Sequence, residues 1–137
     1  MKHKGHGSRM RALAPVLALI TAAMFLLGAC GGKGYKHISQ DKAMQIMEEE
    51  TGYLIVDVRR PDEFAAGHIE GAVNVPNEGI VDEMLEELPD KDQMLLVYCR
   101  TGRRSKEASK KLAKIGYTNV YEFGGIETWT GTIVTED

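Results

Sequence analysis

The chain has 137 residues, of which 43% are hydrophobic and 27% are charged, and its formal net charge is −3. This length fits one modest domain and excludes two large ones. The composition is neither low-complexity nor that of a disordered chain, and the net charge gives no reason to expect binding to nucleic acid.

The first 29 residues differ in character from the rest of the chain. They contain four basic residues and no acidic one. The basic segment is followed by an apolar run over residues 12–29, which is the layout of a secretory signal. The run ends in Leu27-Gly28-Ala29-Cys30, which resembles the lipobox of bacterial lipoproteins.

The lipobox resemblance implies a lipid anchor on the bacterial cell membrane. It implies cleavage after Ala29, lipidation of the Cys30 thiol, and a flexible tether over residues 30–36 in front of a domain at 37–137. The alternative is an uncleaved membrane-spanning helix, because a run of about 18 apolar residues is near the lower limit for a span. In both cases we expect the domain to be extracytoplasmic.

Without this segment, the rest of the chain has a different net charge and a different set of cysteines. Residues 30–137 keep 13 of the 17 Lys and Arg residues and all 20 acidic residues, a formal charge of −7. If Cys30 carries lipid, Cys99 has no partner for a disulfide. A lone thiol in an oxidising compartment suggests a function.

The first half of the domain predicts two helices and a strand. Ser39 is a candidate N-cap for a helix through Met47 that ends before Thr51-Gly52. Residues 53–58 form a largely β-branched, apolar run broken only by Asp57, as in a strand buried on both faces of a parallel sheet. Residues 61–66 suit a short helix with Pro61 in its first turn and Gly67 after its end.

The second half continues the alternation of strands and helices. A short strand is predicted at 71–76 and a helix at 80–88, with apolar residues along one face. A fully apolar strand follows at 94–98, then a helix at 105–115 with its lysines outward, and a last strand at 119–123. This order predicts an α/β layered domain with a mostly parallel sheet of about five strands and helices on both faces.

The loop between the strand at 94–98 and the next helix carries the chemistry. Its sequence is Cys99-Arg100-Thr101-Gly102-Arg103-Arg104. Backbone N–H groups in a tight turn, the N-terminus of the helix and three guanidinium groups would all favour the thiolate, which is the nucleophilic form of cysteine. The same positive field would attract an anionic substrate.

Several motifs together resemble those of a single-domain rhodanese, a sulfurtransferase module, over residues 37–129. They are Asp57-Val58-Arg59, Glu63-Phe64, Gly67-His68-Ile69 before Gly71-Ala72, the Cys99 loop, and Gly124-Gly125-Ile126 before Trp129. The resemblance implies that Cys99 takes the sulfane sulfur of a donor such as thiosulfate, becomes a persulfide, and passes the sulfur to cyanide or a thiol. It implies no metal and no cofactor.

The resemblance also assigns roles around Cys99. The backbone N–H groups of Arg100, Thr101, Gly102, Arg103 and Arg104 would form an anion cradle. Among the arginine side chains, Arg104 is our first candidate for holding the sulfonate end of thiosulfate. Phosphatases of related architecture have an arginine six places after the cysteine, where this chain has Ser105, so the phosphatase alternative is disfavoured.

Other motif residues are interpreted as structural. We expect Arg59 and Glu70 to fix neighbouring loops and His68 to hold a turn by a hydrogen bond, and we leave open whether Asp57 lies at the rim of the pocket. The alternative to an enzyme is a non-catalytic or sulfur-relay module that docks on another protein of the envelope.

Overall fold

The computed structural model describes residues 34–81 and 84–136. The predicted signal segment and the predicted lipidation site, Cys30, lie outside the described residues. Within the described ranges, no helix has the length and apolar character needed to cross a bilayer.

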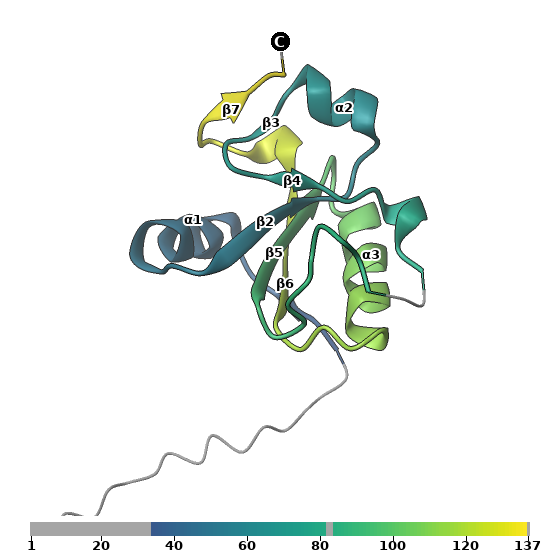
Figure 1. Ribbon diagram of the computed structural model, residues 1–137. Coiled ribbons are helices and arrows are strands. Elements are labelled where there is room, and N and C mark those ends of the chain that lie inside the picture. Colours follow the sequence, from purple (N-terminus) through teal and green to yellow (C-terminus); the bar gives the residue numbers. More distant parts are fainter. Residues whose placement is uncertain (1–33, 82–83, 137) are drawn as a thin grey trace, which may run out of the picture.

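A five-stranded parallel sheet with the order β1-β6-β5-β2-β4 forms the centre of the domain (Figure 1). Its strands are β1 (Lys36–His37), β2 (Tyr53–Asp57), β4 (Val73–Asn74), β5 (Met94–Cys99) and β6 (Val120–Gly125). A separate antiparallel pair joins β3 (His68–Ile69) to β7 (Ile133–Val134). The predicted α/β class with a mostly parallel sheet of about five strands is confirmed.

Helices cover both faces of the sheet, with α1 (Gln40–Glu49) on one and α3 (Arg103–Lys114) on the other (Figure 1). The predicted cap of α1 is confirmed, because the Ser39 hydroxyl accepts a hydrogen bond from the Lys42 amide at 3.1 Å. The short helix α2 (Pro61–Ala66) follows the carboxyl end of β2. Single 3₁₀ turns form at η1 (Asn77–Gly79) and η2 (Ile126–Thr128).

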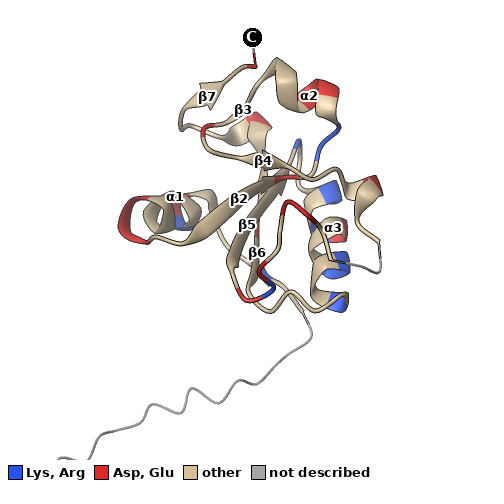
Figure 2. Ribbon diagram, viewed as in Figure 1, with Lys and Arg blue, Asp and Glu red and all other residues tan. Residues whose placement is uncertain are grey.

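The strand β5 shows why the sheet is buried on both faces. Its side chains alternate, so that Leu95, Val97 and Cys99 join the cluster under α3, while Leu96 and Tyr98 join the cluster under α1. All five are at most 1% exposed. Figure 2 shows the basic positions of α3 in blue; Lys106, Lys110 and Lys114 are exposed as predicted, whereas Lys111 is half-buried and donates to the Asn77 carbonyl at 3.0 Å.

The helix predicted over residues 80–88 is wrong. The described part of that segment, residues 80–81 and 84–88, contains no helix. Leu85 and Leu88 are buried although the backbone around them is irregular. The Tyr117 hydroxyl holds this backbone, because it accepts from the Leu85 amide at 3.3 Å and donates to the Leu88 carbonyl at 2.7 Å. Val81 and Met84 are exposed instead of sharing the buried face.

Two further differences concern boundaries and short strands. Helix α3 begins at Arg103, two residues earlier than predicted, because Gly102 takes a left-handed conformation with φ 110° that turns the chain directly into the helix. Strands β1, β3 and β7 have two residues each, which is too short for a periodic pattern. Strand β1 begins at Lys36, inside the segment predicted as tether.

Candidate functional site

Cys99 is the last residue of β5 and lies directly before the loop that leads into α3. This is the carboxyl edge of the parallel sheet, where ligand sites of α/β domains form. The residue is 1% exposed, so its sulfur is enclosed by the loop and by α3.

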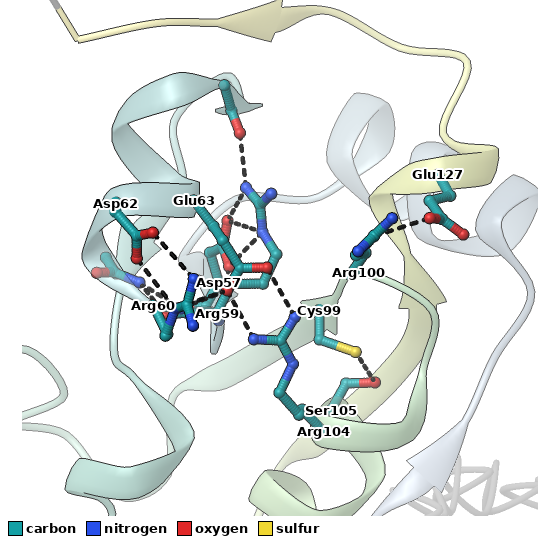
Figure 3. A network of polar contacts seen from close by, with 12 residues as sticks. Asp57, Arg59, Arg60, Asp62, Glu63, Cys99, Arg100, Arg104, Ser105 and Glu127 are labelled. Atoms are coloured by element: carbon teal, nitrogen blue, oxygen red, sulfur yellow. Dashed lines mark hydrogen bonds and ion pairs between the residues drawn. The ribbon is translucent and has the colours of Figure 1, made fainter.

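The Cys99 sulfur has two polar neighbours among the described residues. The Gly102 amide donates to Sγ at 3.0 Å. Figure 3 shows the second neighbour, the Ser105 hydroxyl, which lies 3.5 Å from Sγ. Of the predicted N–H cradle, Gly102 is therefore the amide that contacts the sulfur in the described structure. The N-terminus of α3 adds a partial positive charge at the same place.

Gly125 makes room for this loop. It pairs with Cys99 across the sheet, and a Cβ atom on Gly125 would lie 2.0 Å from the Arg100 carbonyl oxygen. Backbone atoms at that distance cannot be avoided by a side-chain rotation. The close approach of β6 to the loop therefore requires glycine at this position.

Two of the three loop arginines are already paired with acidic residues (Figure 3). Arg104 donates two hydrogen bonds to the Glu63 carboxylate of α2, at 2.7 and 2.9 Å, and Arg100 donates to Glu127 at 2.8 Å. The Arg104 hydrogen bonds lower the pKa of Glu63 to about 2. Arg103 is exposed on the first turn of α3, and Thr101 is exposed in the loop.

Asp57 is fully buried in an ion pair, instead of lying at an exposed rim. Its carboxylate accepts from the Arg59 guanidinium at 2.7 Å and from the Arg59 amide at 2.9 Å. Arg59 in turn donates to the Gly67 carbonyl at 2.6 Å. The pair therefore fixes the end of β2 to the loop after α2. Within the described residues, neither side chain forms a hydrogen bond with the Cys99 loop.

His68 and Glu70 lie outside the Cys99 loop. The His68 Nδ1 atom is 2.8 Å from the Phe64 carbonyl oxygen, and its ring stacks on the Phe64 ring at 3.7 Å between centroids. This is the turn-holding arrangement that we predicted for His68. Glu70 is exposed and lines a shallow groove of about 360 Å³ beside α1.

A buried carboxylate that we did not predict from the sequence lies beneath the loop. Glu122, in the middle of β6, is 0% exposed. It accepts hydrogen bonds from the Ser105 hydroxyl and from the Gly124 amide, both at 2.7 Å, and lies 2.6 Å from Nδ1 of His37. An acidic residue inside an otherwise apolar strand is the sequence signal that could have identified it.

The described residues contain no group of three or more His, Cys, Asp and Glu side chains arranged to hold a metal ion. The residues at the site are a buried thiol, a helix N-terminus, arginines and one buried carboxylate. Such a set favours nucleophilic attack by sulfur on an anionic substrate.

Comparison with known proteins gives a consistent result. The family model described as a rhodanese-like domain matches residues 39–132. The thiosulfate sulfurtransferase GlpE of Pseudomonas entomophila is 37% identical over 99 residues, which cover 72% of this chain and 87% of that protein. The thiosulfate sulfurtransferase PspE of Escherichia coli is 36% identical over 72 residues, covering 53% and 69%.

The fold is also found among solved structures. A structure described as a rhodanese with anions from E. coli superimposes with a TM-score of 0.56 and 32% sequence identity. The superposition covers 61% of this chain and 98% of that one.

Proposed function

This chain belongs to the rhodanese-like domain family, and on that premise we propose that it is a sulfurtransferase in which Cys99 carries the transferred sulfur. The observation that supports this most directly is the position of the Cys99 sulfur, which accepts from the Gly102 amide at 3.0 Å at the start of α3. An N–H donor and a helix N-terminus stabilise a thiolate and equally stabilise a persulfide anion.

The reaction has two transfers of a neutral sulfur atom. The Cys99 thiolate attacks the outer sulfur of thiosulfate, a new S–S bond forms, the original S–S bond breaks, and sulfite leaves with the electron pair. Cyanide or a thiolate then attacks the terminal sulfur of the Cys99 persulfide. The acceptor leaves as thiocyanate or as a new persulfide, and the Cys99 thiolate is restored.

The loop arginines would orient the donor. Arg103 is exposed and free to turn toward a sulfonate group, whereas Arg104 must release at least part of its contact with Glu63 to do the same. We propose that an anionic donor competes with the Glu63 carboxylate for Arg104. Arg100 has a similar but more exposed partner in Glu127, a pair that opens at little cost.

The test is mass spectrometry of the protein after incubation with thiosulfate. We expect the peptide that contains Cys99 to gain one sulfur atom, and expect sulfite to be released in equal amount. The Cys99→Ser variant, which keeps a hydroxyl at the same place, should gain none. A folded wild-type protein that forms no adduct with thiosulfate, with an organic persulfide or with mercaptopyruvate would contradict the proposal.

We also propose that the domain is held at the outside of the bacterial cell membrane by a lipid on Cys30. The support is the sequence of residues 1–30 alone, with its basic start, its apolar run and its Gly28-Ala29-Cys30 ending. Two or more acyl chains are needed for stable attachment.

A further inference from the structure

Glu122 is a fully buried acid placed beside the nucleophile. The Ser105 hydroxyl has one hydrogen, and its shortest contact with an acceptor is the one to Oε1 of Glu122 at 2.7 Å, compared with 2.9 Å to the Gly102 carbonyl and 3.3 Å to the Gly124 carbonyl. A carboxylate is also the stronger acceptor. The Ser105 hydrogen therefore points to Glu122, and a lone pair of its oxygen faces Cys99.

This orientation connects the thiol to the surface. Cys99 is 1% exposed, and its S–H group can donate to Ser105 Oγ at 3.5 Å. Glu122 is 0% exposed, but its Oε2 atom contacts Nδ1 of His37, whose side chain is 62% exposed. The chain Cys99, Ser105, Glu122, His37 is a continuous hydrogen-bonded route from the buried sulfur to water.

The surroundings of Glu122 contain few other charges. Within the described residues, the polar partners of its carboxylate are His37 from β1, Ser105 from α3 and the Gly124 amide of its own strand. From α1, the uncharged Gln40 side chain donates to the neighbouring Gly125 carbonyl. The basic side chains on the first turn of α3 are directed elsewhere: Arg103 and Lys106 are exposed and Arg104 is held by Glu63.

We propose that Glu122 accepts the Cys99 proton through Ser105, and that His37 exchanges protons between Glu122 and the solvent. In this step the S–H bond breaks, the proton moves to Ser105 Oγ, and the hydrogen of Ser105 moves to Oε1 of Glu122. A neutral His37 whose Nδ1 carries no hydrogen then accepts the proton from Glu122 and releases its Nε2 proton to water, so that the Glu122 carboxylate is restored. This role deepens the proposed sulfurtransferase function, because it supplies the thiolate that attacks the donor.

The two possible roles of Glu122 predict opposite changes in the reaction rate of Cys99 when the acid is made neutral. If Glu122 were only a buried negative charge, replacing it by the neutral Gln would remove a repulsion and speed the reactions of the Cys99 thiolate. If Glu122 is the proton acceptor, the same replacement slows them. Glu122→Gln suits this test because its amide oxygen can still accept from Ser105 and from the Gly124 amide.

The experiment is the rate of alkylation of Cys99 by iodoacetamide from pH 5 to pH 9, followed by mass spectrometry of the peptide that contains Cys99. We expect the wild-type rate to rise with pH and then to level off once Glu122 holds the Cys99 proton. In Glu122→Gln we expect the rate at pH 7 to fall about a hundredfold, the lower end of what a positioned proton acceptor contributes. Its rate should keep rising with pH.

His37→Gln tests the surface end of the route. Because His37 is exposed, this variant should fold even if Glu122→Gln does not, and its alkylation profile should differ from that of the wild type. Lys36→Gln, on the same strand and exposed, is the matched control and should follow the wild-type profile.

Two results would overturn the proposal: a Glu122→Gln rate at pH 7 equal to or above that of the wild type, or a His37→Gln profile identical to the wild type. Thermal unfolding of each variant checks that it is folded. Parallel incubation with thiosulfate separates this inference from the proposed function, because alkylation reports the thiolate even if no persulfide forms.

Discussion

The Glu63 carboxylate stabilises two parts of the fold at once, so the stability of the domain depends on its protonation state. Its carboxylate accepts from the Arg60 amide at 3.0 Å, which closes the first turn of α2. It also accepts both hydrogen bonds of Arg104 across the site. A single side chain therefore holds α2 against the start of α3, in front of Cys99.

The pH dependence of stability follows from the Glu63 pKa. This pKa is lowered by the Arg104 hydrogen bonds from 4.5 to about 2, so the folded state favours the charged form. The stabilisation is complete above the ordinary pKa and is lost as the pH falls from about 4.5 to about 2. We expect Glu63→Gln to lower the free energy of unfolding at pH 7 by about 1 kcal/mol, since the pair is partly exposed.

Urea unfolding at pH 7, 4 and 3 measures this effect. The difference between the wild type and Glu63→Gln should shrink as the pH falls, because protonation of Glu63 removes the same interaction. Glu48→Gln, an exposed change on α1, is the control and should unfold as the wild type does. A difference that stays constant from pH 7 to pH 3 would contradict this account.

At the scale of elements, the site is formed by the close packing of β5, β6 and α3 around one loop. Gly102 gives the left-handed turn that starts α3 at Arg103. Gly125 lets the Arg100 carbonyl pass over β6. The two glycines therefore determine where the Gly102 amide and the Ser105 hydroxyl lie relative to the Cys99 sulfur.

Gly125→Ala tests this packing. Because the new Cβ atom would lie 2.0 Å from the Arg100 carbonyl oxygen, the loop must move. We expect the free energy of unfolding to fall by on the order of 2 kcal/mol, and persulfide formation to slow at least about tenfold because the N–H donor is displaced. Gly79→Ala, which has open space around it, is the matched control. Equal rates in the two variants would refute the steric argument.

The elements also show what the sequence could predict. Strand β5 was identifiable because its apolar run is continuous, and helix α3 because its apolar and charged positions follow the helical period over twelve residues. The segment around Leu85 carries helical spacing without a helix, because the buried Tyr117 hydroxyl binds its backbone and lets irregular chain fill the core. No local pattern reports such a long-range contact.

The same distinction applies to the site. Cys99 and its loop could be identified because the residues are contiguous and because all of them favour a thiolate and an anionic substrate. The pairing of Arg104 with Glu63 and the approach of Glu122 to Ser105 join residues that are 41 and 17 positions apart. These contacts depend on the order of strands in the sheet, which the alternation of elements alone does not specify.

At the scale of the whole molecule, the predicted anchor can be tested directly. In bacteria that express the full chain with labelled palmitate, we expect label on the wild type and on Cys99→Ala, and none on Cys30→Ala. Loss of the lipid should leave the alkylation profile of Cys99 unchanged, because the domain forms its own core. Label on Cys30→Ala would contradict lipidation at Cys30, and an unlabelled wild type that retains residues 1–29 in the membrane would favour the spanning helix.

The parallel arrangement of the sheet has a consequence for how the domain is presented. Strand β1 runs in the same direction as β6, so the described chain enters at Gly34 beside the amino ends of the strands, while Cys99 lies at the carboxyl end of β5 (Figure 1). The length of β5, six residues, is about 20 Å at the usual rise of a strand. If the domain is attached through its N-terminal side, as proposed, the carboxyl end of β5 lies on the side away from the point of attachment. Donor and acceptor molecules would then reach Cys99 from open solution instead of from the lipid surface.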